Sequence, residues 1–310
     1  MSQPSSAPGG EARLALTAGI GCYFIWGFVP LVFQAMGHLG VGAWEILAHR
    51  IFWGAPTSAV FVAMARQWGQ VRRVLRRPRV LGLLVLSAAL IAVNWTIFIM
   101  AVNSGRVLET SLGYFINPLL NMATGALIFR ERLDRTAMAA IGLAVVGVVL
   151  QTAALGHLPI ISLTLAVSFL GYGLVRKQVA AEAQTGLFIE CLALAPFAAG
   201  LIFWLEAGGG HGHFLTNPAA AAWMVACGPL TAAPLVLFAW SARRMPLSAI
   251  GFLQFIAPSI TFFMGLAEGE AFTPLRAVSF AFIWAGAAVF ALGAWRRGRR
   301  VATLAAQADA

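Results

Sequence analysis

Charged residues are scarce in this 310-residue chain: they make up 10% of it, whereas hydrophobic residues make up 60%. Soluble domains carry about 25% charged and about 45–50% apolar residues. A single soluble core could not bury so much apolar surface, so the composition excludes an ordinary soluble protein. The mean hydropathy of +0.83 indicates a chain that lies largely in a membrane.

Lysine is almost absent, and acidic residues are few. The 21 basic residues outnumber 11 acidic ones and give a net charge of +10, yet only Lys177 is a lysine. The arginines are scattered between apolar runs, and no zinc-finger or RNP motif occurs. We therefore expect a lipid bilayer, and no nucleic acid, as the partner of this basic chain.

Cysteine is limited to Cys22, Cys191 and Cys227, each within an apolar segment and without CxxC spacing. This predicts neither a disulfide framework nor a metal site. The loop EAGGGHGHFLTNP holds His211 and His213, but a metal site normally needs three or four ligands. We expect a solvated loop there, and no metal. Walker A, HExxH and GxSxG motifs are also missing, so no nucleotide or other cofactor is expected.

Long apolar runs are what the chain has in abundance. About 20 residues are needed to cross the hydrocarbon core. We predict an all-α polytopic membrane protein with ten transmembrane helices, approximately at 14–36, 41–65, 80–102, 107–129, 136–154, 158–175, 185–205, 220–241, 246–267 and 273–295. The Pro/Gly/Ser-rich residues 1–12 are predicted to be a disordered tail.

The arginines orient these helices. With the N-terminus inside, 18 of the 21 Lys and Arg fall on the inner side, and only Arg106 and Arg276 lie near outer ends. This distribution follows the positive-inside rule. We expect a bacterial inner (plasma) membrane protein with both termini in the cytoplasm, and with 297–310 as a cytoplasmic C-terminal tail.

An internal repeat divides the chain. YFINP, from Tyr114, and QFIAP, from Gln254, match at an offset of 140 residues. They belong to the fourth and ninth expected helices, which cross the membrane in opposite directions. This indicates two inverted five-helix repeats, at 13–155 and 156–296, an arrangement typical of secondary transporters.

Several longer motifs carry a family resemblance. YFIWGFVPLVFQ, WEILAHRIFW, VLETSLGYFINPL and GFLQFIAP, together with Asn94 and Trp95 in IAVNW, resemble the RarD family of EamA-domain permeases in the drug/metabolite transporter superfamily. The resemblance runs from about residue 14 to residue 295. It implies two EamA-type repeats and a small-molecule permease whose substrate is unsettled.

Polar residues within the expected helices mark the candidate site. Glu45 would lie about 6 Å deep and Arg50 about 13 Å deep, near the midplane. Charges at that depth are costly and usually functional. His49 shares a face with Glu45, whereas Arg50 is turned about 140° away from Glu45 and should seek a partner on another helix. We expect Arg50 to be held by Glu109, or by Glu45, when no substrate is bound. The predicted translocation residues are Glu45, His49, Arg50, Asn94, Trp95, Glu109, Tyr114, Asn117 and Gln254.

Function follows from these features as an expectation. We predict a secondary-active small-molecule permease that alternates access, coupled to a gradient of protons, with Glu45, His49 and Glu109 as candidate carriers. The expected substrate is an amino acid, an organic acid or a drug-like metabolite. The buried Arg50 favours an anionic or carboxylate-bearing solute, because guanidinium binds carboxylate bidentately. A membrane-embedded enzyme, or a channel or sensory protein, is the alternative. The oligomeric state, monomer or homodimer, is left open.

Overall fold

The computed structural model describes residues 8–103, 107–130, 133–155, 158–207, 212–267 and 273–308, and these ranges contain helices and no strand. The helices of the first half of the chain are α1 (Pro8–His38), α2 (Ala43–Met64), α3 (Trp68–Leu75), α4 (Pro78–Asn103), α5 (Val107–Leu127) and α6 (Arg135–Leu155). Those of the second half are α7 (Ile160–Gln178), α8 (Ala183–Ala207), α9 (Pro218–Ala242), α10 (Leu247–Leu253), α11 (Ile256–Ala267) and α12 (Pro274–Ala308).

Within the described ranges, six helices are long and apolar enough to cross a membrane: α1, α2, α4, α7, α8 and α9. Shorter apolar stretches occur in α6, in α10–α11 and in α12, at residues 135–150, 249–261 and 277–293. The all-helical polytopic architecture is therefore confirmed. The count of ten crossings and the inverted symmetry stay predictions.

Two helix boundaries and one loop differ from those expected. Helix α1 already begins at Pro8, so residues 8–12 are helical rather than part of a tail, and α12 continues through the expected tail to Ala308. Residues 66–79, which connect the second and third expected helices on the inner side, contain α3, whose Val71 and Val74 are buried while Arg72 and Arg73 are exposed. Such an amphipathic helix suits a membrane interface.

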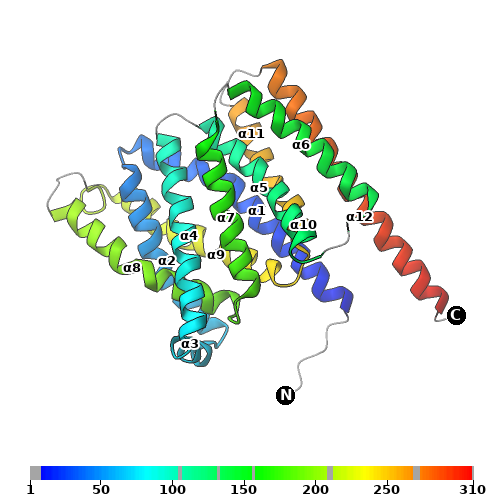
Figure 1. Cartoon of the computed structure of the whole chain (residues 1–310). Coiled ribbons are helices and arrows are strands. Elements are labelled where there is room, and N and C mark those ends of the chain that lie inside the picture. Colours follow the sequence, from blue (N-terminus) through cyan, green and yellow to red (C-terminus); the bar gives the residue numbers. More distant parts are fainter. Residues whose placement is uncertain are drawn as a thin grey trace.

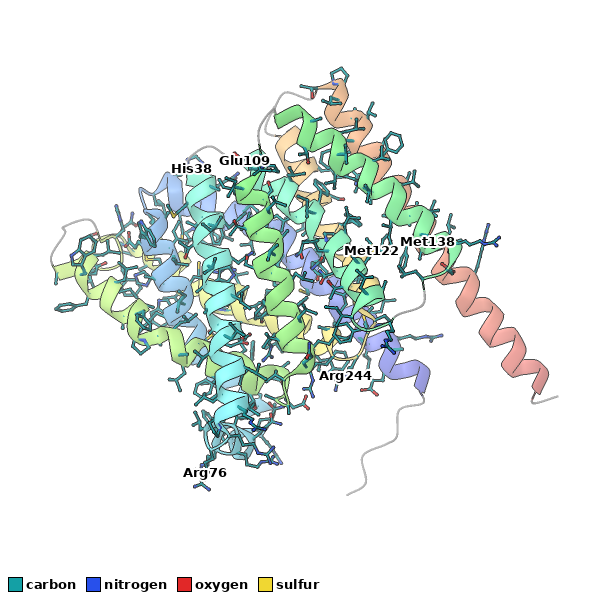
Figure 2. The ribbon with its side chains drawn as sticks, viewed as in Figure 1. His38, Arg76, Glu109, Met122, Met138 and Arg244 are labelled. Atoms are coloured by element: carbon teal, nitrogen blue, oxygen red, sulfur yellow. The ribbon has the colours of Figure 1, made fainter. Side chains whose placement is uncertain are left out.

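The two ends of the bundle differ in their residues. Figure 2 places His38 and Glu109 at one end and Arg76 and Arg244 at the other. The sequence assigned the first two to outer ends and the last two to inner loops, so each pair falls on one side as expected.

The distribution of polarity is the reverse of that in a soluble protein. Large apolar side chains point outward, among them Met64, Leu127 and Phe197, each more than 75% exposed. Polar side chains lie inside, including Glu45, Arg50 and Asn94 among many others. An apolar exterior suits a lipid solvent, and the polar groups buried within the largely apolar core must find partners within the protein.

Helices from the two proposed repeats interleave. Helix α1 packs on α9 and α11, α2 packs on α8 and α9, and α4 packs on α7 and α8. Helices α6 and α12 lie side by side at the edge of the bundle (Figure 1). The core is therefore shared between the halves.

The ninth expected helix, 246–267, is not continuous. It breaks at Gln254–Phe255 into α10 and α11, because Pro258 lacks an N–H and its ring crowds the carbonyl of Gln254, four residues earlier. Pro118, at the matching place in the other repeat, leaves α5 unbroken. Helix α10 packs on α5 at Gly251, where a Cβ would lie 2.8 Å from the carbonyl oxygen of Pro118. Only glycine permits that close approach.

Candidate functional site

Arg50 lies where four helices meet, and only 6% of it is exposed. Its Nε donates a hydrogen bond of 2.9 Å to Oγ1 of Thr231 on α9. The guanidinium carbon lies 4.2 Å from the ring centroid of Trp95 on α4 and 5.5 Å from that of Phe33 on α1. A desolvated cation–π contact stabilises by about 2 kcal/mol. Aromatic faces and one hydroxyl thus hold this cation.

The expected pairing of Arg50 with Glu45 or Glu109 is wrong for this conformation. None of the ion pairs between described side chains joins Arg50 to a carboxylate. Glu45 is bonded by His213 instead. Glu109 is buried on α5, and that helix packs mainly on α7 and α10 rather than on α2. Among the described titratable groups, Tyr114 and Cys227 interact electrostatically with Arg50.

A second buried arginine behaves differently. Arg176 was expected in an inner loop but is fully buried in α7, with its Nη1 3.5 Å from Oε1 of Glu190 on α8. Its Nη2 donates to the carbonyl oxygen of Ala183, and the hydroxyl of Ser87 donates to Glu190. Arg176 is therefore neutralised by Glu190, whereas no carboxylate in the described part of the chain neutralises Arg50.

A chain of side-chain amides crosses from α5 to the break between α10 and α11. Nδ2 of Asn121 donates to Oε1 of Gln254 at 2.8 Å and to Oδ1 of Asn117 at 3.3 Å. All three residues are buried, and Nε2 of Gln254 has no hydrogen-bond partner in the described part of the chain. The hydroxyl of Tyr23 on α1 faces the same amide. The structure thus brings the predicted Asn117 and Gln254 together through Asn121.

Asn94 serves helix packing. Its Nδ2 donates to the carbonyl oxygen of Leu165 at 2.9 Å and to Oγ of Ser168 at 3.1 Å, both on α7. Hydrogen bonds of this kind between membrane helices stabilise by about 0.6 kcal/mol on average. The amide that was expected at a translocation path is engaged between α4 and α7.

Glu45 and His49 lie in the first two turns of α2, just before Arg50, and beside the segment 212–217. Oε1 of Glu45 accepts from the backbone N–H of His213 at 2.6 Å, and Oε2 lies 2.9 Å from the ring Nδ1 of the same residue. The ring of His49 stacks on Phe214. The described part of this loop is therefore anchored on α2 rather than solvated as expected, and His211 lies outside the described residues.

The sequence analysis missed Asn121 and Thr231 of these networks, and also Glu206 at the end of α8, whose Oε1 accepts a hydrogen bond from the backbone N–H of Phe214. Asn121 could have been found, because it lies four residues after Asn117 on the same helical face. Thr231 and Glu206 gave no such signal, since a single threonine in an apolar run, or a carboxylate at a helix end, is common without function.

Comparisons with known proteins fit this architecture. The model of the EamA-like transporter family matches residues 13–153. Protein RarD of Escherichia coli (strain K12) is 40% identical over 292 residues, which are 94% of this chain and 98% of that protein. Protein RarD of Salmonella typhi is 42% identical over 286 residues, 92% and 96% of the two chains.

Two further matches agree. An "Uncharacterized transporter" of Vibrio cholerae serotype O1 is 39% identical over 289 residues, 93% of this chain and 95% of that one. A solved crystal structure shares 21% identity with a TM-score of 0.67 and covers 91% of this chain and 98% of its own, which shows the fold alone.

The fold and these relatives define a multi-pass membrane transporter of the EamA-like type. Within that class, the chain belongs to the RarD family of EamA permeases, and the resemblance seen in its motifs is confirmed.

Proposed function

We propose that this protein is a secondary-active permease of the bacterial inner membrane that moves a small carboxylate-bearing solute by alternating access. An amino acid, an organic acid or a drug-like metabolite of that charge would bind at Arg50. The repeats 13–155 and 156–296 would rock against each other, with both termini in the cytoplasm. The range matched by the family model, 13–153, has nearly the bounds of the first repeat.

The observation that carries this proposal is the uncompensated charge of Arg50. A buried cation is costly unless it is paired, and the fold supplies a carboxylate to Arg176 but none among the described side chains to Arg50. Its two terminal nitrogens take part in no hydrogen bond there. A substrate carboxylate would bond them in a bidentate manner.

The surroundings supply the rest of a binding site. Tyr114 lies within electrostatic reach of the guanidinium, and Trp95 covers one of its faces. The amide chain Asn117–Asn121–Gln254 presents further hydrogen-bonding groups on α5 and α10. These residues come from both proposed repeats, as expected for a site at the repeat interface.

A gradient would provide the energy, and the proton is the favoured coupling ion. Glu45 and His49 at the outer end of α2, and Glu109 at the start of α5, are the candidate carriers. Uptake measured in proteoliposomes with and without an imposed pH gradient tests the coupling.

Arg50→Lys tests the site. Lysine keeps the charge but loses the fork that binds carboxylate and the flat face that stacks on Trp95. We expect the flux of the transported carboxylate to fall at least about tenfold, equivalent to about 1.4 kcal/mol. A panel of amino acids, organic acids and neutral or cationic solutes in proteoliposomes identifies the substrate first.

Arg244→Lys is the matched control. Arg244 also lies 4.2 Å above an indole ring, that of Trp240, but it is exposed and paired with Glu11. Flux in this variant should stay within about twofold of wild type, because surface pairs contribute little. Normal carboxylate flux in Arg50→Lys and Arg50→Gln would refute the assignment.

A further inference from the structure

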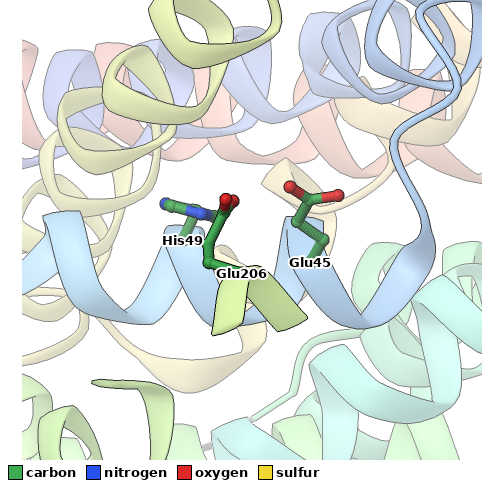
Figure 3. A group of neighbouring side chains, drawn as sticks. All are labelled: Glu45, His49 and Glu206. Carbon is green, nitrogen blue, oxygen red and sulfur yellow. The ribbon is translucent and has the colours of Figure 1, made fainter. Parts of the chain in front are cut away.

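Three potential metal ligands converge near the outer end of α2. Glu45 and His49 come from α2 and Glu206 comes from the last turn of α8, and their donor atoms all lie within 4.8 Å of one another. Figure 3 shows the carboxylate of Glu206 beside the ring of His49, with Glu45 one turn earlier on α2. Glu45 and His49 are each only 2% exposed.

One ring nitrogen of His49, Nε2, makes no hydrogen bond within the described part of the chain. Nδ1 accepts a 3.3 Å hydrogen bond from the indole N–H of Trp53, one turn onward on α2. Nε2 is buried and without a hydrogen-bond partner in the described part of the chain. Because Nδ1 is engaged by Trp53, Nε2 is the ring nitrogen that remains available to a ligand. Leaving such an atom unbonded is unfavourable, and a bound cation would satisfy it.

The carboxylates are held in place by the loop that follows α8. The backbone N–H and the ring of His213 bond Glu45, and the backbone N–H of Phe214 donates to Oε1 of Glu206 at 3.1 Å. The ring of Phe214 stacks on His49. Outer contacts that orient the ligands in this way are a regular feature of metal sites.

We propose that Glu45, His49 and Glu206 bind a divalent transition-metal ion such as Zn²⁺, with the fourth position open to water or a substrate group. Two carboxylate oxygens and one imidazole nitrogen form a donor set that suits this class of ion. Metal–ligand bonds of about 2.0–2.2 Å require the three donor atoms to draw together by roughly 1 Å.

Binding has a consequence for Trp53. The indole N–H can only donate, so in the neutral ring it fixes the proton of His49 on Nε2. A metal on Nε2 displaces that proton and places one on Nδ1, which then repels the indole N–H. Metal loading therefore moves the ring proton of His49 from Nε2 to Nδ1 without net release, and it should change the fluorescence of Trp53.

The test uses the full chain, purified in detergent with a tag free of histidine. We expect about one Zn²⁺ per chain in equilibrium dialysis, and Co²⁺ should give the visible absorption of a site with nitrogen and oxygen ligands. His49→Gln and Glu206→Gln should each weaken Zn²⁺ binding at least about tenfold. Trp53→Phe should bind Zn²⁺ at least as tightly as wild type but lose the fluorescence change.

His38→Gln is the matched control. This histidine is exposed at the same end of the bundle, so its removal should leave the affinity for Zn²⁺ unchanged. Wild-type protein that takes up neither Zn²⁺ nor Co²⁺ overturns the proposal and leaves the cluster as a proton-binding group. Equal affinity in wild type, His49→Gln and Glu206→Gln overturns it too. Binding is measured without transport, so this result is independent of the proposed permease activity.

Discussion

Glu190→Gln tests whether the contribution of an ion pair to stability depends on its burial or on the distance between its charges. Glutamine keeps the shape of Glu190 and an oxygen for Ser87, but it removes the negative charge beside Arg176. The guanidinium stays fully buried, and its Nε and Nη1 have no hydrogen-bond partner in the described part of the chain. The variant therefore strands a charge inside the protein.

The geometry gives the size of the effect. Two unit charges 3.5 Å apart attract each other by about 4.7 kcal/mol at an effective dielectric constant of about 20. Measured losses on removing one partner of a buried pair are about 3–5 kcal/mol. We expect the free energy of unfolding of Glu190→Gln to fall by that amount in an SDS titration of the protein in mixed micelles.

Glu182→Gln is the control. If the distance between the charges alone set the stability of an ion pair, this variant would lose more stability than Glu190→Gln. Glu182 lies only 2.9 Å from Arg243, but the two side chains are 36% and 25% exposed. Exposed pairs contribute about 0–1 kcal/mol, so this variant should lose little stability. Equal losses in Glu182→Gln and Glu190→Gln would refute the reasoning, as would a failure of Arg176→Met to restore stability to Glu190→Gln.

Two further predictions concern orientation and helix packing. In intact cells an impermeant thiol reagent should label Leu215→Cys but not Arg76→Cys, while the native cysteines are buried and should stay silent; labelling of Arg76→Cys before permeabilisation would reverse the topology. Gly228→Ala should lower stability by about 1–3 kcal/mol by overpacking, because its Cβ would lie 2.6 Å from the carbonyl oxygen of Trp53. Gly142→Ala, which has no atom within 4 Å of its Cβ, should be neutral in the same unfolding titration.

Hydropathy and length predicted the helices well, because a segment that crosses lipid must be apolar over a fixed length whatever its neighbours are. Pro258 indicated that the helix expected at 246–267 could break. Pro118 lies at the same position within its motif, YFINP, yet it leaves α5 continuous. The difference depends on packing, where α10 presses Gly251 against α5. A local pattern does not contain that information.

The side-chain partners were harder to predict than the helices. Burial and polarity marked Arg50, Asn117 and Gln254 as inward-facing, and the structure places all three inside. The partner of Arg50 depends on which helices are in contact. Because α2 packs on α9, Arg50 bonds to Thr231 rather than to Glu45 or Glu109, which are nearer in sequence. Sequence depth estimates fix the height of a group in the membrane but not its neighbour around the bundle.

The packing of helices from one half against helices from the other also affects the order in which contacts can form during biosynthesis. Thr231 follows Arg50 by 181 residues, and His213 follows Glu45 by 168. At about 5–20 residues per second, a ribosome needs roughly 10 to 40 s to make the later partner after the earlier residue. Helix α2 is therefore synthesised before the partners of Glu45 and Arg50 exist. Until α8 and α9 are inserted, these charged side chains must be solvated by water or by the insertion machinery.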